Sequence, residues 1–138
     1  MARTGTVLRN TKETQIEVVV NLDGGDVNVK TGIGFFDHML TAFGFYAKIG
    51  LTVQATGDLY VDGHHTVEDV GICLGLALKQ ALGDRAGIRR FGSCYVPMDE
   101  ALTFTALDFS NRPYLVFDAS MPQERIGEYD SCLTVEFM

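Results

Sequence analysis

The stretch with the most distinctive chemistry is residues 62–69, which have the sequence DGHHTVED. It holds two of the 3 histidines in the chain, His64 and His65. If a helix begins near His64, Glu68 follows one histidine by four residues and the other by three, so each pair shares a helix surface. The two rings point about 100° apart on such a helix. One metal ion could therefore bind His64 and another His65, with Glu68 within reach of either.

A simpler explanation competes with a metal site, because a histidine pair at the start of a helix is more often a cap or a surface feature. The remaining histidine, His38, lies in the apolar stretch FFDHML at residues 35–40. A histidine buried in such a stretch needs a hydrogen-bond partner. Taken singly, His38 is best explained as a core histidine bonded to a backbone carbonyl. Metal binding by His38 is favoured by the presence of His64 and His65 in the same chain.

Three arginines, Arg89, Arg90 and Arg112, are candidates for binding an anion. A guanidinium group can hold a phosphate through two parallel hydrogen bonds. Each arginine is also explained as a solvated surface charge, and Glu13, in a polar N-terminal run, as an exposed carboxylate. The glycines in TGIG at residues 31–34 do not form a GxGxxG motif, and they favour a strand-to-helix turn over a nucleotide-binding loop.

The size and charge of the chain restrict its class. A length of 138 residues fits one domain, or one and a part. The net charge of −7 argues against nucleic acid as the main partner. No apolar run approaches the ~18 residues of a membrane span, and no signal segment opens the chain. The 3 cysteines form no CxxC pair, so they are expected to be reduced core thiols of a cytoplasmic protein.

The periodicity of the first half predicts strands and two helices. Residues 14–22 alternate as a strand, 23–26 form a turn, 27–30 return as a short strand, and 50–55 form another strand. Residues 35–46 are predicted as a helix whose apolar face holds Phe36, Met39, Leu40 and Phe43 and whose weak end lies at Gly44. Residues 66–82 form the clearest helix, ended by Gly83. Its apolar stripe consists of Val67, Val70, Cys73, Leu74, Ala77, Leu78 and Ala81.

After residue 90 the pattern restarts. Residues 91–98, 101–108 and 114–118 are predicted as strands, and 129–138 as the opening of another helix. On this register residues 135–138 correspond to residues 36–39 of the first half. The correspondence places Glu136 next to the position that answers His38, and makes it an additional candidate for a metal ligand.

Residues 31–40 and 62–69 resemble the imidazoleglycerol-phosphate dehydratase family, manganese enzymes of histidine biosynthesis. Three further stretches agree in the same order, and the resemblance extends from about residue 3 to residue 138. These stretches are RNTKET at residues 9–14, VPMDEAL at 96–102 and DFSNRPY at 108–114.

The resemblance implies an α+β fold in which two-layer sheet-and-helix units occur in tandem duplication (ribosomal protein S5 domain 2-like). The first unit would be residues 1–88. Residues 89–138 would be the N-terminal part of the second unit, which is incomplete here.

The implied reaction is a hydro-lyase step that converts imidazole glycerol phosphate to imidazole acetol phosphate and water. Manganese, two ions per subunit in the family, would stabilise an imidazolate form of the substrate. The implied metal ligands, which also meet the substrate, are His38, His64, His65 and Glu68. By the same resemblance Glu13 would contact the substrate and act as an acid or base, and Glu68 is also placed among the catalytic residues. The implied phosphate ligands are Arg90 and Arg112.

One departure from the family is large. Family members are longer and carry a second His-His-x-x-Glu motif near the C-terminus, whereas this chain ends at residue 138 and has no fourth histidine. The main general base is expected in that motif or across a subunit boundary. A cytoplasmic homo-oligomer, a shell of 24 subunits for the intact protein, is expected from the resemblance. The alternatives are a metal hydrolase or another lyase with a different substrate, and an inactive fragment or metal-binding assembly module with an incomplete site.

Overall fold

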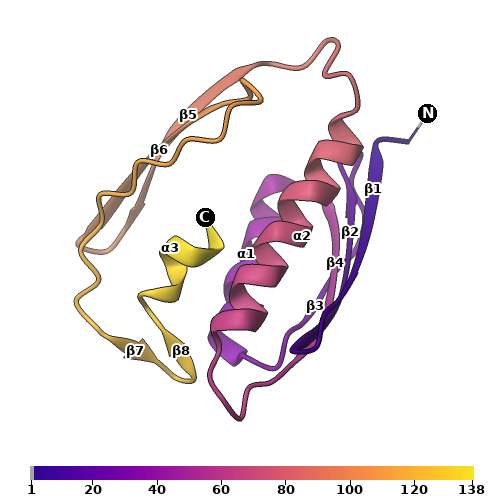
Figure 1. The fold of residues 1–138 in the computed structure, drawn as a ribbon. Coiled ribbons are helices and arrows are strands. Elements are labelled where there is room, and N and C mark those ends of the chain that lie inside the picture. The colour runs from indigo at the N-terminus through magenta and orange to yellow at the C-terminus, as the bar shows by residue number, and fades with distance from the viewer. Residues whose placement is uncertain (1) are drawn as a thin grey trace. The chain divides into compact units, whose positions relative to one another are not determined.

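The computed structural model describes residues 2–138, and its main feature is a four-stranded sheet (Figure 1). The strand order is β1 (Thr4–Asn10), β2 (Thr14–Asn21), β4 (Gly50–Gly57) and β3 (Val27–Lys30). Along β2, residues alternate between buried and more exposed positions, as the predicted period of two requires. Strand β1 is not predicted from the sequence, because its apolar and polar residues alternate only weakly.

The predicted pairing of β3 is wrong. The turn at residues 23–26 suggested that β3 returns alongside β2, but β3 pairs in parallel with β4, and β4 pairs antiparallel with β2. Helix α1 (Gly34–Ala47) connects the two parallel strands, which a parallel pair requires because a tight turn cannot join them. Gly24 and Gly25 have positive φ values of 99° and 142°, which carry the chain away from β2.

Both long helices cover the same face of the sheet (Figure 1). Helix α2 (His64–Leu82) begins two residues before its predicted start and ends at Gly83, where φ is 55°. It packs against the backbone of β1 at Gly5, where an added Cβ would overlap the Ala77 carbonyl oxygen. Its predicted stripe is confirmed, with Leu78 only partly buried. The buried members are Val67, Val70, Cys73, Leu74, Ala77 and Ala81.

Helix α1 differs from the prediction in its face and its end. Phe36 and Leu40 are buried, but Met39 and Phe43 are each 41% exposed. Gly44 does not weaken the end of the helix, which continues to Ala47. The glycine is buried, and its lack of a side chain lets the helix approach β3 closely. An added Cβ would lie 2.9 Å from Val27 Cγ2.

The C-terminal residues 117–138 belong to the same compact unit as the sheet and its helices. The helix predicted over residues 129–138 is only α3 (Leu133–Phe137), because residues 129–130 form strand β8 (Tyr129–Asp130) with β7 (Arg125–Ile126). The ring of Tyr129 stacks on Phe36 at a centroid distance of 5.8 Å.

Residues 84–116 form a second compact unit. Strands β5 (Phe91–Met98) and β6 (Ala101–Asp108) pair antiparallel as predicted, with Asp99 in the connecting turn at a φ of 50°. The strand predicted over residues 114–118 is absent, because strand-forming residues make a strand only where a partner completes the ladder. The predicted boundary between residues 88 and 89 separates two duplicated units. A division of the chain by contacts does not test such a duplication, so the boundary stays a prediction.

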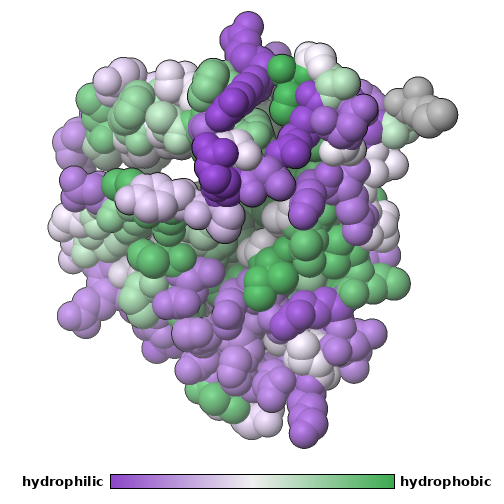
Figure 2. All heavy atoms as spheres, turned by 45° about the horizontal axis from the view of Figure 1, so that its top comes forward, coloured by the Kyte–Doolittle hydropathy of each residue, from purple (hydrophilic) through white to green (hydrophobic). Residues whose placement is uncertain are grey.

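The three cysteines are free, as expected, but only Cys73 is buried, whereas Cys94 and Cys132 are exposed. Within residues 2–138, no helix is both long enough and apolar enough to span a membrane. Green hydrophobic side chains also reach the surface shown in Figure 2. Among the large apolar residues with most exposure are Leu8 at 71%, Phe45 at 71% and Tyr60 at 92%.

Candidate functional site

The first turn of α2 brings His64 and Glu68 together. The Asp62 Oδ1 atom accepts a hydrogen bond of 2.8 Å from the His64 backbone N–H and so fixes the start of the helix. One turn later, Glu68 Oε2 lies 3.6 Å from His64 Nε2, with the two side chains 42% and 45% exposed. The predicted i,i+4 pair is therefore formed, and both groups are accessible from solvent.

His65 has a different partner. Its Nδ1 atom lies 2.9 Å and 3.2 Å from the two carboxylate oxygens of Asp58, a residue in the loop before the helix. The hydrogen bond with Asp58 raises the pKa of His65 above its usual value, and the negative charges of Asp58, Glu13 and Asp62 act in the same direction. The rings of His64 and His65 have a centroid distance of 6.1 Å and an interplanar angle of 71°. The two histidines therefore have different partners, Glu68 for His64 and Asp58 for His65.

His38 lies on α1 and is exposed, so its interpretation as a buried core histidine is wrong. The neighbouring Asp37 has the structural role in this turn. Its Oδ1 atom accepts hydrogen bonds from the Thr31 backbone N–H at 2.7 Å and from the Thr31 hydroxyl at 2.6 Å. This arrangement leaves the imidazole of His38 outside the core, where it is available to a ligand.

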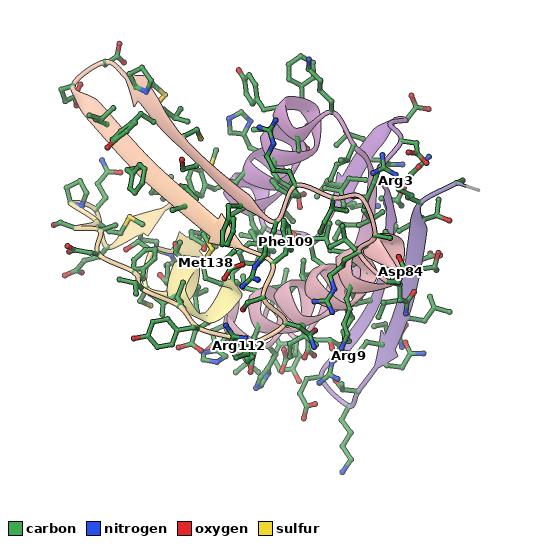
Figure 3. The ribbon with its side chains drawn as sticks, turned by 90° about the horizontal axis from the view of Figure 1, so that it is seen from above. Arg3, Arg9, Asp84, Phe109, Arg112 and Met138 are labelled. Carbon is green, nitrogen blue, oxygen red and sulfur yellow. The ribbon has the colours of Figure 1, made fainter. Side chains whose placement is uncertain are left out.

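A buried carboxylate that the sequence analysis did not assign lies directly after Glu68. Asp69 is 7% exposed, and it accepts hydrogen bonds from Arg9 Nε at 2.8 Å and from the Thr14 hydroxyl at 2.5 Å. Thr14 and Glu13 in turn donate their backbone N–H groups to the Thr11 hydroxyl oxygen. The network ties the turn that carries Glu13 to the helix that carries the histidines. Arg9, at the end of β1, is labelled in Figure 3.

A signal in the sequence could have found this carboxylate. Asp69 lies three residues after Thr66 and four before Cys73, both fully buried positions of α2. A charged residue on the buried face of a helix requires a partner of opposite charge or a hydrogen-bond donor. The partners, however, come from residues more than 50 positions away in the chain, and the helical pattern contains no information about them.

Glu13 is exposed in the turn between β1 and β2. Its negative charge is one of those that raise the pKa of His65.

The predicted phosphate ligands Arg90 and Arg112 lie in the unit formed by residues 84–116. Arg90 is already paired with Asp108, through Nε to Oδ1 at 2.7 Å and a terminal nitrogen to Oδ2 at 3.1 Å. This pairing raises the pKa of Arg90 and lowers the pKa of Asp108. Arg112, labelled in Figure 3, also acts electrostatically on Asp108. A phosphate group bound by Arg90 would have to compete with this carboxylate.

Within residues 2–138, no three histidine, cysteine or acidic side chains come together as a complete metal site. The His64–Glu68 pair does fit two positions of one site, because two ligands about 2.1 Å from a cation lie up to roughly 4.2 Å apart. His38, His65 and the exposed Glu136 are not gathered with this pair into one cluster. Within the described residues, the spacing of His64 and Glu68 is therefore compatible with two positions of a metal shell and not with a complete one.

Comparisons with known proteins place these features in context. A family model described as imidazoleglycerol-phosphate dehydratase matches residues 31–138. The imidazoleglycerol-phosphate dehydratase of Streptococcus gordonii is 57% identical over 136 residues, which cover 98% of this chain and 70% of that relative. A relative of the same name from Rhodopseudomonas palustris is 58% identical, with 69% of its length covered.

Solved structures agree with the sequence matches. The crystal structure of imidazoleglycerol-phosphate dehydratase from Staphylococcus aureus has a TM-score of 0.86 and 36% identity, and the match covers 97% of this chain and 74% of that one. The corresponding protein from Pyrococcus furiosus has a TM-score of 0.80 and 40% identity, with 95% of this chain and 69% of that one covered. The predicted α+β fold class is confirmed by these neighbours.

Proposed function

The chain belongs to the imidazoleglycerol-phosphate dehydratase family, and we propose that it dehydrates imidazole glycerol phosphate to imidazole acetol phosphate in histidine biosynthesis with manganese as cofactor. The family membership supports a dehydratase acting on a small phosphate ester. The observation that carries the manganese proposal is the accessible His64–Glu68 pair at 3.6 Å, on the helix where the family motif falls.

The chemical difficulty of the reaction lies in the carbon-bound proton, which has no adjacent carbonyl group to acidify it. When bound, manganese would supply a Lewis acid that favours the imidazolate form of the substrate ring. His38, His64, His65 and Glu68 would hold the ions, and the different partners of His64 and His65 are compatible with two separate ions. A mixed imidazole and carboxylate ligand set is compatible with manganese.

The remaining roles go to Glu13 and the arginines. Glu13 is exposed in the turn that the hydrogen bonds of Thr11 and Thr14 tie to Asp69 of α2, and by resemblance to the family it would exchange a proton with the substrate. Arg90 and Arg112 would bind the phosphate, and Arg90 would exchange its pairing with Asp108 for pairing with the ester. The other metal ligands and the main base would come from another subunit of a homo-oligomer or from a second His-His-x-x-Glu motif.

The test is to measure bound manganese and dehydration of imidazole glycerol phosphate in His64→Ala and His65→Ala variants of the protein. Each variant should lose manganese and turnover. Glu17→Gln, on β2, is the control, because it removes a charge from an exposed carboxylate of the same unit and should leave both unchanged. Full manganese content in both histidine variants would remove these residues from the proposed site.

A second candidate, a metal-binding module without turnover, is favoured by the absence of a three-ligand cluster within residues 2–138. Expressing residues 1–138 alone distinguishes the dehydratase from the metal-binding module. The module hypothesis predicts weak manganese binding and no dehydration. A chain of this length that binds manganese tightly and turns over substrate would contradict it, and would also refute the expectation that the main base lies elsewhere.

A further inference from the structure

Asp58 has no role in the proposed mechanism, yet its carboxylate faces a predicted metal ligand. It lies directly after β4, in the loop that leads into α2. Both of its oxygens lie within 3.2 Å of His65 Nδ1, and its side chain is only 12% exposed, against 45% for His65. The carboxylate is thus held by its surroundings, while the imidazole reaches outward from it.

We propose that Asp58 is a positioning residue that holds His65 with a proton on Nδ1 and directs Nε2 outward as the nitrogen that binds a ligand. A carboxylate accepts hydrogen bonds only, so a neutral His65 must donate its Nδ1–H to Asp58. The lone pair is then on Nε2, on the side of the ring remote from Asp58. The orientation of the ring follows from the geometry alone, and only the identity of the ion rests on the proposed function.

The loop contains a second aspartate that serves as a contrast. Asp62 accepts a hydrogen bond from the backbone N–H of His64 at 2.8 Å, so it fixes the start of the helix rather than a ring. His64 instead has Glu68 near its Nε2 atom at 3.6 Å. The two aspartates therefore have separate tasks, and the two adjacent histidines are held differently. A hydrogen-bonded acceptor behind a ligating histidine typically strengthens metal binding 10–100-fold.

The first test determines directly, and without metal, which ring nitrogen of His65 carries the proton. Nitrogen-15 NMR of the histidine side chains reports which nitrogen carries the proton, and the chain has only 3 histidines. The spectrum is recorded on metal-free protein at a pH where His65 is neutral, and His65→Gln assigns its signals. The wild type should show the proton on Nδ1. Asp58→Ala should lose this preference, and Asp58→Asn should keep it, because the amide oxygen still accepts.

Asp62→Asn is the matched control, since it removes a nearby negative charge while keeping the acceptor for His64. It should leave the His65 proton on Nδ1. A wild-type proton on Nε2, or the same proton position in the wild type and Asp58→Ala, would overturn the proposal. If Asp58→Ala does not fold, Asp58→Ser takes its place, because the shorter serine side chain withdraws the acceptor from His65 Nδ1 and should likewise abolish the preference.

The second test measures binding of Mn²⁺ by titration. Asp58→Ala should bind the His65-dependent ion 10–100-fold more weakly, Asp58→Asn should fall between that variant and the wild type, and Asp62→Asn should remain close to the wild type. Equal affinity in Asp58→Ala and the wild type would show that the orientation does not serve ion binding. If the wild type binds no Mn²⁺, the proposed function fails, whereas the NMR result still decides the role of Asp58.

Discussion

Replacing Thr14 with valine removes a hydroxyl that makes two hydrogen bonds in the buried network behind the candidate site, one to Asp69 and one with the Thr11 hydroxyl at 3.1 Å. The Thr14 hydroxyl donates to Asp69 Oδ2 at 2.5 Å, and the two residues are 2% and 7% exposed. Valine keeps the shape of threonine but removes the donor, so the carboxylate loses one of its two partners without access to water. A hydrogen bond to a charged group contributes about 1.5–3 kcal/mol.

Arg9 moderates the loss, because it still donates to Asp69 Oδ1. Thr14→Val should therefore lower the free energy of unfolding by about 2 kcal/mol, which corresponds to a fall in melting temperature of roughly 4–10 °C for a chain of this size. Calorimetry or thermal denaturation followed by circular dichroism measures the change. Turnover should fall as well, because the same network holds the turn that carries Glu13.

The matched control is Thr41→Val, which removes a hydroxyl that bonds to the Asp37 backbone carbonyl on the exposed surface of α1. Such surface substitutions change stability by less than about 0.5 kcal/mol. If Thr14→Val were no more destabilising than Thr41→Val, the buried carboxylate would have to be satisfied in another way. The reasoning that connects Asp69 to the stability of the site would then be refuted.

Three further outcomes are expected. Arg90→Ala and Arg112→Ala should each weaken binding of the phosphate ester about tenfold or more in equilibrium titrations, and unchanged affinity in both would exclude them as phosphate ligands. Because pairing with Arg90 lowers the pKa of Asp108 below 3.8, its stabilising effect is present above the unfolded pKa and is lost as the pH falls through the folded one. An Arg90→Gln variant should bring this pKa, measured by NMR, back toward 3.8. Gly5→Ala should lower the free energy of unfolding by about 1–3 kcal/mol, because its methyl group would overlap the Ala77 carbonyl oxygen; an unchanged melting temperature would show that α2 can shift away.

Several features followed from the sequence because they depend on residues close together in the chain. The stripe of α2 repeats with the helical period, and the i,i+4 spacing of His64 and Glu68 forms the expected pair once that helix exists. Strands β2, β4, β5 and β6 are also recognisable from their apolar periodicity and their bounding turns. The motifs in their order were sufficient to identify the family, which the comparisons confirm.

Other features depend on which distant residues meet, and only the tertiary structure determined them. Periodicity indicates that β3 is a strand but not that its partner is β4. It places Asp69 on a buried face but does not supply Arg9, and it does not pair Asp58 with His65. The physical reason is that a local pattern specifies the direction in which a side chain points, whereas its partner is set by how the elements pack.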